Sequence, residues 1–193
     1  MTSHEPNDAP DVPSRRQPAL VTQRLQLRPV EQSDVDALWA LWIEPGVRRF
    51  LWDDRMISPD DAAATVNACL SLRHAGLGLW MLDRHNVLEG AGRTIGCAGL
   101  LPVSTAVEFE PRLGGLVEPL IALAPSVWRQ GYAHEALSAL IMYAKGSLGL
   151  PRLAGVTDVP NVASDRMLRR AGFAVLGETP GPRHRLRTYL LDL

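Results

Sequence analysis

The chain has 193 residues, of which 21% are charged, and a formal net charge of −1. This length suits one ordinary domain with a hydrophobic core rather than two. The balanced charge supplies no positive field to hold a polyanion, which disfavours nucleic-acid binding as the main role. No apolar run approaches the roughly 20 residues that cross a bilayer, and the first residues lack the basic-then-apolar order of a signal peptide. We therefore expect a cytoplasmic protein that does not bind membranes.

The cysteines and histidines indicate no metal site. Cys69 and Cys97 lie far apart in sequence and both have apolar neighbours. Buried, reduced thiols in a cytoplasmic protein account for this pattern. His74 and His85 have no partners at the spacing that metal ligands need.

The first residues predict a tail followed by a strand and a helix. Residues 1–18 carry four prolines among polar residues and have little to bury, so we expect a disordered tail and a single domain over residues 19–193. Residues 25–28 alternate in polarity, as a strand does. Ser33 and Asp36 resemble a capping box before an amphipathic helix. Glu44-Pro45-Gly46 should end that helix.

A second helix begins clearly at Ser58-Pro59-Asp60-Asp61, where an N-cap, a proline and two acidic residues suit a helix start. It should run to about His74 and stop at Gly76. The remaining pattern predicts strands at residues 79–82, 94–103 and 116–123, a helix at 131–145, a strand at 153–157, a helix at 163–170, and strands at 173–176 and 186–191. This order predicts one α/β domain around a mixed sheet.

The most informative segment spans residues 120–135, where an apolar strand runs into a short turn and Gly131 opens an amphipathic helix. N–H groups in the first turn of a helix have no internal partner, and the helix dipole adds positive charge there. Together they form an anion site suited to a pyrophosphate. Gly131 allows close backbone approach, small Ala133 leaves the next turn unobstructed, and Arg129 adds a charged donor. An ordinary strand-to-helix turn would show the same local pattern.

A second motif follows thirty residues after Gly131. Asn161-Val162-Ala163-Ser164 precedes Met167-Leu168-Arg169-Arg170-Ala171-Gly172-Phe173. This pair of motifs resembles the GNAT superfamily, and most of all the branch of ribosomal-protein N-terminal acetyltransferases. Residues 20–29 (LVTQRLQLRP) are similar to that branch's first strand, and residues 128–136 (WRQGYAHEA) to its phosphate loop. The resemblance covers roughly residues 20–178 and implies the GNAT fold with acetyl-CoA as co-substrate.

The resemblance also implies the residues that bind the cofactor. The backbone of Ile121, Ala122 and Leu123 would pair with the pantetheine arm. Asn161 would contact the CoA arm, and Ser164 would lie near the departing sulfur. The pyrophosphate would be held by Arg129, Gln130, Gly131, Tyr132, Ala133 and His134.

Two positions of this loop depart from the superfamily's pattern. Trp128 stands where the wider superfamily prefers Arg or Gln, although tryptophan suits this branch. His134 replaces the usual Thr or Ser, and either a bond to phosphate or a place on the helix surface would explain it.

Acetyl transfer needs a base, because the attacking amine must lose a proton, and a polarised carbonyl, which a strand N–H can provide. Glu118 stands on the cofactor strand, ten residues before Trp128, where this branch commonly carries a glutamate that acts as base, often through water. An apolar cleft would raise its pKa toward neutrality. The alternative is a solvent-facing glutamate at a strand edge, which neighbouring Pro119 favours.

Ser164 is the candidate that donates a proton to the CoA thiolate or holds a water that does so. Its other interpretation is as a cap of the helix begun by Asn161, and the two roles are compatible. The family's better-known acid is a tyrosine, but Tyr143 would lie in the middle of a helix.

Two weaker patterns concern the acceptor. Trp52-Asp53-Asp54 follows the first helix, a region that lines the acceptor side in similar proteins, and would attract a cationic amine unless these are ordinary loop acids. Arg183, Arg185 and Arg187 alternate and should share one strand face. They would hold an acidic substrate or RNA, or form a solvated face.

The sequence therefore predicts an N-acetyltransferase that moves the acetyl group of acetyl-CoA to a primary amine, either a protein N-terminus or a small molecule. The alternative is a non-catalytic acyl-CoA-binding GNAT module that acts as a sensor or partner-binding domain. The identity of the acceptor, the length of the acyl group and the choice between monomer and homodimer stay open at this stage.

Overall fold

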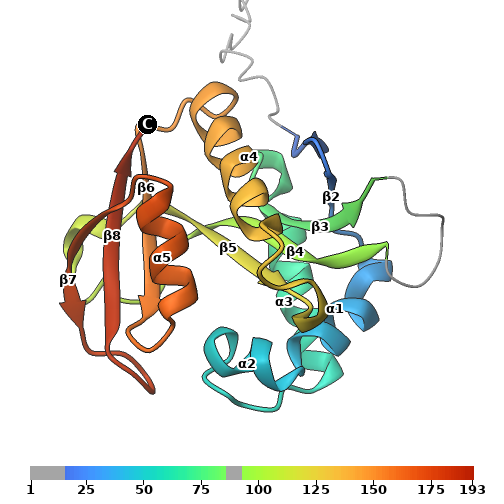
Figure 1. Cartoon of the computed structure of the whole chain (residues 1–193), viewed down its shortest axis with the longest axis horizontal. Helices are drawn as coiled ribbons and strands as arrows, with labels where there is room; N and C mark the ends of the chain where they lie inside the picture. The colour runs from blue at the N-terminus through green and yellow to red at the C-terminus, as the bar shows by residue number, and fades with distance from the viewer. Residues whose placement is uncertain (1–15, 86–92) are drawn as a thin grey trace, which may run out of the picture.

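The computed structural model describes residues 16–85 and 93–193 and arranges the strands in two sheets (Figure 1). The five-stranded sheet has the order β1 (Leu20–Val21), β2 (Leu25–Pro29), β3 (Gly78–Arg84), β4 (Thr94–Pro102), β5 (Val117–Leu123). The three-stranded sheet has the order β6 (Arg152–Asp158), β8 (Leu186–Asp192), β7 (Ala174–Thr179). The α/β fold class is confirmed. The single mixed sheet that we expected is divided in two, and every ladder between the described strands is antiparallel.

The helices cover both faces of the larger sheet. They are α1 (Val35–Trp42), α2 (Pro45–Leu51), α3 (Pro59–Ser71) and α4 (Tyr132–Gly146), whereas α5 (Val162–Arg170) packs against β6 of the smaller sheet. Because side chains alternate along a strand, Trp80 and Leu82 of β3 pack in the core under α4, whereas Leu79 and Met81 pack in a second core with α1 and α3. Within the described ranges, no helix is long and apolar enough to cross a membrane.

Two helix boundaries differ from the prediction. The capping box is formed by Glu31 and Asp34, two residues before the pair that we expected, and it belongs to a short 3-10 turn, Gln32–Asp34, that leads into α1. The first helix ends at Trp42, just before Glu44-Pro45-Gly46 as predicted, but Pro45 also begins α2, which the sequence analysis did not predict. Proline suits the first turn of a helix because its missing N–H would have no partner there. By contrast, Ser58 caps α3 in a full capping box with Asp61, as predicted.

The cysteines and the first described residues belong to the packed domain. Cys69 and Cys97 are buried and free, and burial raises the pKa of their thiols to about 11 and about 12. Residues 1–15 of the expected tail, and residues 86–92 of the predicted β3–β4 turn, lie outside the described residues. Gln17, which we placed in the tail, is buried and donates through its side-chain amide to the Leu79 carbonyl at 3.0 Å. The Trp80 indole donates to the carbonyl of Pro18 at 2.6 Å.

The two sheets meet at β5 and β6, which are joined by α4 (Figure 1). These strands are in contact, but no ladder joins them among the described strands. One edge of β5 pairs with β4, and its other edge therefore has backbone groups free to bind a ligand. The site lies at this junction.

Candidate active site

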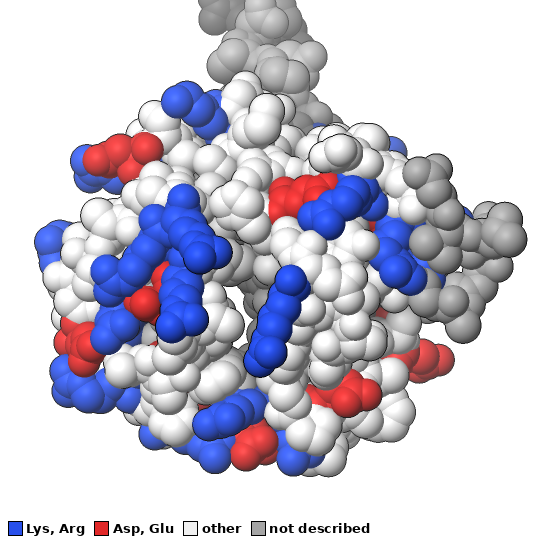
Figure 2. Space-filling model, in the orientation of Figure 1, with Lys and Arg blue, Asp and Glu red and all other residues white. Residues whose placement is uncertain are grey.

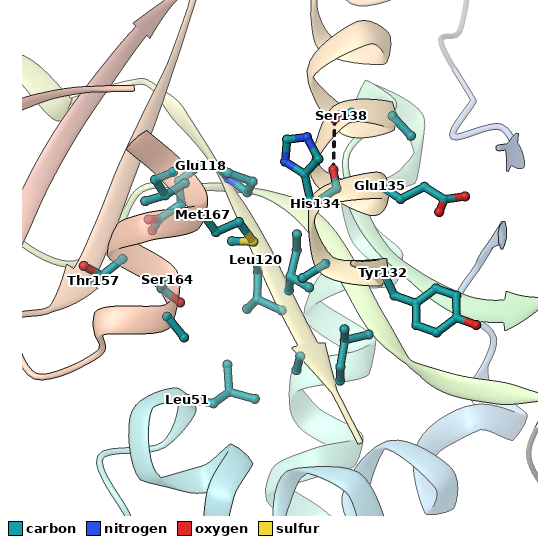
Figure 3. A pocket seen from close by; sticks show the side chains of 18 of the residues that line it. Leu51, Glu118, Leu120, Tyr132, His134, Glu135, Ser138, Thr157, Ser164 and Met167 are labelled. Carbon is teal, nitrogen blue, oxygen red and sulfur yellow. Dashed lines mark hydrogen bonds between the residues drawn. The ribbon is translucent and has the colours of Figure 1, made fainter. Parts of the chain in front are cut away.

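One large cleft, of about 2030 Å³, opens between the two sheets. Its walls come from β5, the first turns of α4, the end of β6, and α5, with α2 at one end. Figure 3 shows His134 projecting from α4 on one side, Ser164 and Met167 on α5 on the other, and Leu120 of β5 between them. Basic side chains gather over α5 beside the hollow (Figure 2), and Arg166 and Arg170 line the cleft.

The turn before α4 presents a row of free backbone amides. Gly131 is the N-cap, with a left-handed φ of 84°, and no side chain caps this helix. The first helical amide with a backbone acceptor is that of Glu135, which donates to the Gly131 carbonyl at 3.2 Å. Within the described chain, the amides of residues 129–134 have no backbone acceptor. Unpaired amides at the positive end of a helix dipole are the groups that suit an anion such as a phosphate, and they belong to the residues for which the sequence predicts this role.

This turn is braced by Arg24, which lies just before β2. Arg24 Nε bonds to Glu135 Oε2 at 2.6 Å, and its Nη1 donates to the Gln130 carbonyl at 3.0 Å. The guanidinium also lies 4.5 Å from the centre of the Tyr132 ring. Burial raises the pKa of Glu135, but hydrogen bonds from Thr22 and Arg24 outweigh it and leave that pKa lowered. The brace keeps Glu135 ionised and fixes the turn; the sequence analysis missed it.

The neighbouring turn is held by Trp128 and by an unusual backbone at Arg129. The Trp128 indole N–H donates to the Leu123 carbonyl at 2.7 Å. A Cβ on Gly46 of α2 would lie 2.5 Å from the Trp128 ring, so only glycine permits this packing. Arg129 has a φ of 61°, a costly value for a residue with a side chain. Such strain is common where a loop is shaped for a ligand.

Of the other residues predicted to bind the cofactor, some line the cleft and one does not. Ile121, Ala122 and Leu123 line the cleft while pairing with β4 on their far edge, as the pantetheine prediction requires. His134 also lines the cleft and is exposed. Gln130 does not line the cleft, because its side chain turns back to the Ser126 carbonyl at 3.2 Å.

Glu118 lies on β5 where this strand is still close to β6, and it lines the cleft. It is partly buried, and this loss of water raises its pKa to about 7, although a hydrogen bond from the Val156 N–H lowers it. A carboxyl with a pKa near neutrality is able to accept a proton at physiological pH. The alternative of an ordinary solvent-facing glutamate does not fit this burial.

Asn161 and Ser164 both line the cleft at the start of α5, but their capping roles are the reverse of the alternative that we considered. Asn161 is the cap: its Oδ1 accepts the Ser164 N–H at 3.3 Å. Tyr143, by contrast, donates its hydroxyl to the Gly76 carbonyl at 3.0 Å and packs edge-on against Trp80. Its hydroxyl is thus held in the core.

The three arginines near the C-terminus do not share a strand face, because only Arg187 lies in β8. Arg187 pairs with Asp165 and Glu178, Arg185 also pairs with Glu178, and Arg183 pairs with Asp54 of the turn after α2 at 2.9 Å. These ion pairs remove the basis for an RNA-binding strand. In the described part of the chain, no cluster of His, Cys, Asp or Glu could hold a metal ion.

Comparison with known proteins agrees with this geometry. The family model described as "Acetyltransferase (GNAT) domain" matches residues 24–174. The "Uncharacterized N-acetyltransferase YoaA" of Bacillus subtilis (strain 168) is 29% identical over 157 residues, which cover 81% of this chain and 82% of that protein.

Two solved structures from Salmonella typhimurium have the same fold. One is an acetyltransferase described as modifying the N-terminal serine of ribosomal protein L7/L12, with a TM-score of 0.70, 19% identity, and coverage of 89% of this chain and 96% of that chain. The other is a putative acetyltransferase with its cofactor acetyl-CoA, with a TM-score of 0.65, 20% identity, and coverage of 88% and 94%. With a family model that matches most of its length, the chain belongs to the GNAT acetyltransferases, the acetyl-CoA-dependent N-acetyltransferases.

Proposed function

We propose that this enzyme transfers the acetyl group of acetyl-CoA directly to a primary amine, with Glu118 as the general base. The observation that carries this proposal is the position of Glu118 in the cleft, combined with a pKa raised by burial to about 7. A base of that pKa is partly ionised at physiological pH and still attracts a proton strongly enough to help the amine attack.

The cofactor would lie along the free edge of β5, with its pyrophosphate on the amides of residues 129–134. Two features support this placement: those amides have no backbone acceptor in the described chain, and Arg129 lies in the same turn of the cleft wall. Charge-assisted contacts from Arg166 and Arg170 are available on the opposite wall.

The proposed reaction balances without any further reagent. The amine nitrogen attacks the thioester carbonyl carbon, its proton passes to Glu118 directly or through a water, and the carbon–sulfur bond breaks. The departing thiolate takes a proton, for which the Ser164 hydroxyl is the candidate donor. A backbone N–H on the free edge of β5 would stabilise the negative charge that develops on the carbonyl oxygen. The products are an amide and CoA.

The test is Glu118→Gln, which keeps the shape of the side chain and removes the base. We expect kcat to fall by about 100-fold or more, with the Kd for CoA within about twofold of the original, measured by thiol release and by calorimetry. In the unsubstituted enzyme kcat/KM should rise with pH through about 7, and this inflection should disappear in the variant.

Glu108→Gln is the matched control, because Glu108 is an exposed glutamate that does not line the cleft. It should leave both the rate and the pH profile unchanged. Undiminished turnover in Glu118→Gln would remove Glu118 as the base. Tight CoA binding without acetylation of any amine, in the unsubstituted chain, would instead favour a CoA-binding module.

A further inference from the structure

The carboxylates of Asp158 and Asp53 lie at the end of the cleft beyond Glu118. Among the described residues, no cationic side chain forms a hydrogen bond with either of them. Asp158 ends β6, Asp53 lies in the turn after α2, and both line the cleft. Asp158 is only 7% exposed, and its Oδ1 has no hydrogen-bond partner in the described chain. Burial, and then the negative charge of Asp53, raise the pKa of Asp158. A buried carboxylate oxygen without a hydrogen-bond partner is costly and rare, which points to a ligand.

The nearby cationic groups are directed elsewhere. Arg183 pairs with Asp54 at 2.9 Å and donates to the backbone carbonyl of Asp53 at 3.2 Å. His184 lies with its ring centre 6.5 Å from that of Phe50. Both residues lower the pKa of Asp158 through their charge, but neither forms a hydrogen bond with it in the described chain.

The turn that carries Asp53 has a strained backbone and is held in place by ion pairs with residues outside the turn. Asp53 and Asp54 have φ values of 52° and 63°, in the left-handed region that residues with side chains seldom adopt. Arg48 and Arg183 both pair with Asp54 and so hold this conformation. The carboxylate of Asp53, by contrast, has no hydrogen bond among the described residues, although it is partly buried. The ion pairs thus fix the turn and leave the Asp53 charge available.

The register of β6 relates this acidic pair to Glu118. The backbone N–H of Val156 in β6 acts on the Glu118 carboxyl and lowers its pKa, and Asp158 follows Val156 by two residues in the same strand. Two residues of a strand span about 7 Å. We propose that Asp158 and Asp53 bind a second cationic group of the acceptor, which is therefore a small diamine rather than a monoamine. This inference rests on the proposed role of Glu118 at the reacting amine.

A bound ammonium group would balance the negative charges at this end of the cleft. An ammonium group between the two carboxylates supplies the donors that Asp158 lacks and offsets the repulsion from Asp53. The other end of a short alkyl chain would then reach Glu118, where the amine loses its proton. A monoamine of the same length would leave both carboxylates without a partner and should be a poor substrate.

Putrescine and n-butylamine provide the test, because they share a four-carbon chain and differ in the second amine. We expect kcat/KM for putrescine to exceed that for n-butylamine by roughly 100-fold. Asp158→Asn should reduce this preference at least about tenfold while changing kcat/KM for n-butylamine by less than about threefold. Asp192→Asn, which removes a carboxylate that is exposed and outside the cleft, should leave the preference unchanged.

Equal kcat/KM values for the two amines, or an equal loss for both in Asp158→Asn, would overturn the assignment. If Asp158→Asn fails to fold, Asp53→Asn takes its place, since Asp53 is less buried and should lose the same preference. A peptide with lysine at its second position that is acetylated more efficiently than putrescine would also overturn the small-molecule assignment.

Calorimetry with putrescine in the presence of CoA measures the subsite without turnover. We expect binding that weakens at least about tenfold in Asp158→Asn and by no more than about threefold in Glu118→Gln. Absence of putrescine binding would overturn the subsite. Undiminished turnover in Glu118→Gln, with putrescine still bound through Asp158, would overturn only the assigned base, so the two failures are distinguishable.

Discussion

The two ends of the cleft are built in different ways. The backbone of the cofactor end is a local structure: the amides of residues 129–134 come from one turn and one helix, although Arg24 from the start of the chain braces them. The acceptor end is assembled from the turn after α2, the end of β6 and the β7–β8 loop, which meet only in the folded chain. The contrast shows which end is defined by general chemistry and which by the particular substrate.

Their polar groups differ as well. At the cofactor end Glu135 receives hydrogen bonds from Thr22 and Arg24, so the charged groups of the protein neutralise one another and leave the backbone amides for the proposed ligand. At the acceptor end Asp158 is buried without a hydrogen-bond partner for Oδ1 in the described chain, and Glu118 carries a raised pKa. The burial of these two carboxyl groups therefore costs stability, as we expect if they bind the acceptor and take its proton.

The largest expected effect tests this cost directly at Glu118. The rise of its pKa from the ordinary 4.5 to about 7 corresponds to about 3 kcal/mol. Because the folded-state pKa is raised, Glu118 favours folding only while it is protonated, and that contribution is lost as the pH rises from 4.5 through 7. Glu118→Gln should therefore exceed the original chain in free energy of unfolding by less than about 1 kcal/mol at pH 5 and by about 3 kcal/mol at pH 8.

Urea denaturation at both pH values measures this difference, with Glu108→Gln as the control that should show none. A variant no more stable than the original at pH 8 would mean that Glu118 is solvated, and the proposed contrast between the two ends would lose its main support.

The cofactor end should respond most strongly at Gly131. Gly131→Val puts a branched side chain at a φ of 84°, with its Cβ 3.3 Å from Arg24 Nη2. Left-handed backbone costs about 1–2 kcal/mol in a residue with a side chain, so we expect the Kd for CoA to rise at least about tenfold. Gly146→Ala is the control, since nothing lies within 4 Å of that Cβ at the other end of α4. Unchanged CoA affinity in Gly131→Val would contradict the proposed phosphate site.

The sequence was sufficient wherever a feature depends on neighbouring residues. Ser58 caps α3 and Gly131 opens α4, both as predicted. In each case the side chain, or the absence of one, acts on backbone groups within a few positions. Glu118 was placed through family resemblance, and its raised pKa then depended on the burial that β5 and β6 create.

The sequence was insufficient wherever partners are distant or one residue fits two structures. Arg24 and Glu135 are 111 positions apart, and no local pattern pairs them. Pro45 is compatible with both a helix end and a helix start; α1 ends just before it and α2 begins at it, and only the end was predicted. Alternation along a strand does not reveal its neighbour, so the division into two sheets was missed. The burial of Asp158 had no sequence signal, because it depends on the packing around the end of β6.

A smaller effect should appear at the brace of the cofactor end. Arg24→Met and Glu135→Gln each remove one partner of the same contact, and we expect about a fivefold loss of CoA affinity from each. The double variant should lose little more than either single one, which corresponds to a coupling of about 1 kcal/mol. Arg152→Met, which breaks an exposed ion pair with Asp192, is the control. Fully additive losses would show that the two residues act separately on the cofactor.

The smallest expected effect is that of a substitution at Arg183, which should change the binding of the amine without changing the binding of CoA. Arg183→Gln removes the ion pair with Asp54 and the bond to the Asp53 carbonyl, so the strained turn should relax and displace the Asp53 carboxylate. Because this ion pair is exposed and worth at most about 1 kcal/mol, we expect KM for the amine to rise about threefold. The Kd for CoA should not change. Arg185→Gln, which loses only contacts to Glu178, should alter neither constant. A loss of CoA affinity in Arg183→Gln would mean that the two ends are coupled rather than independent.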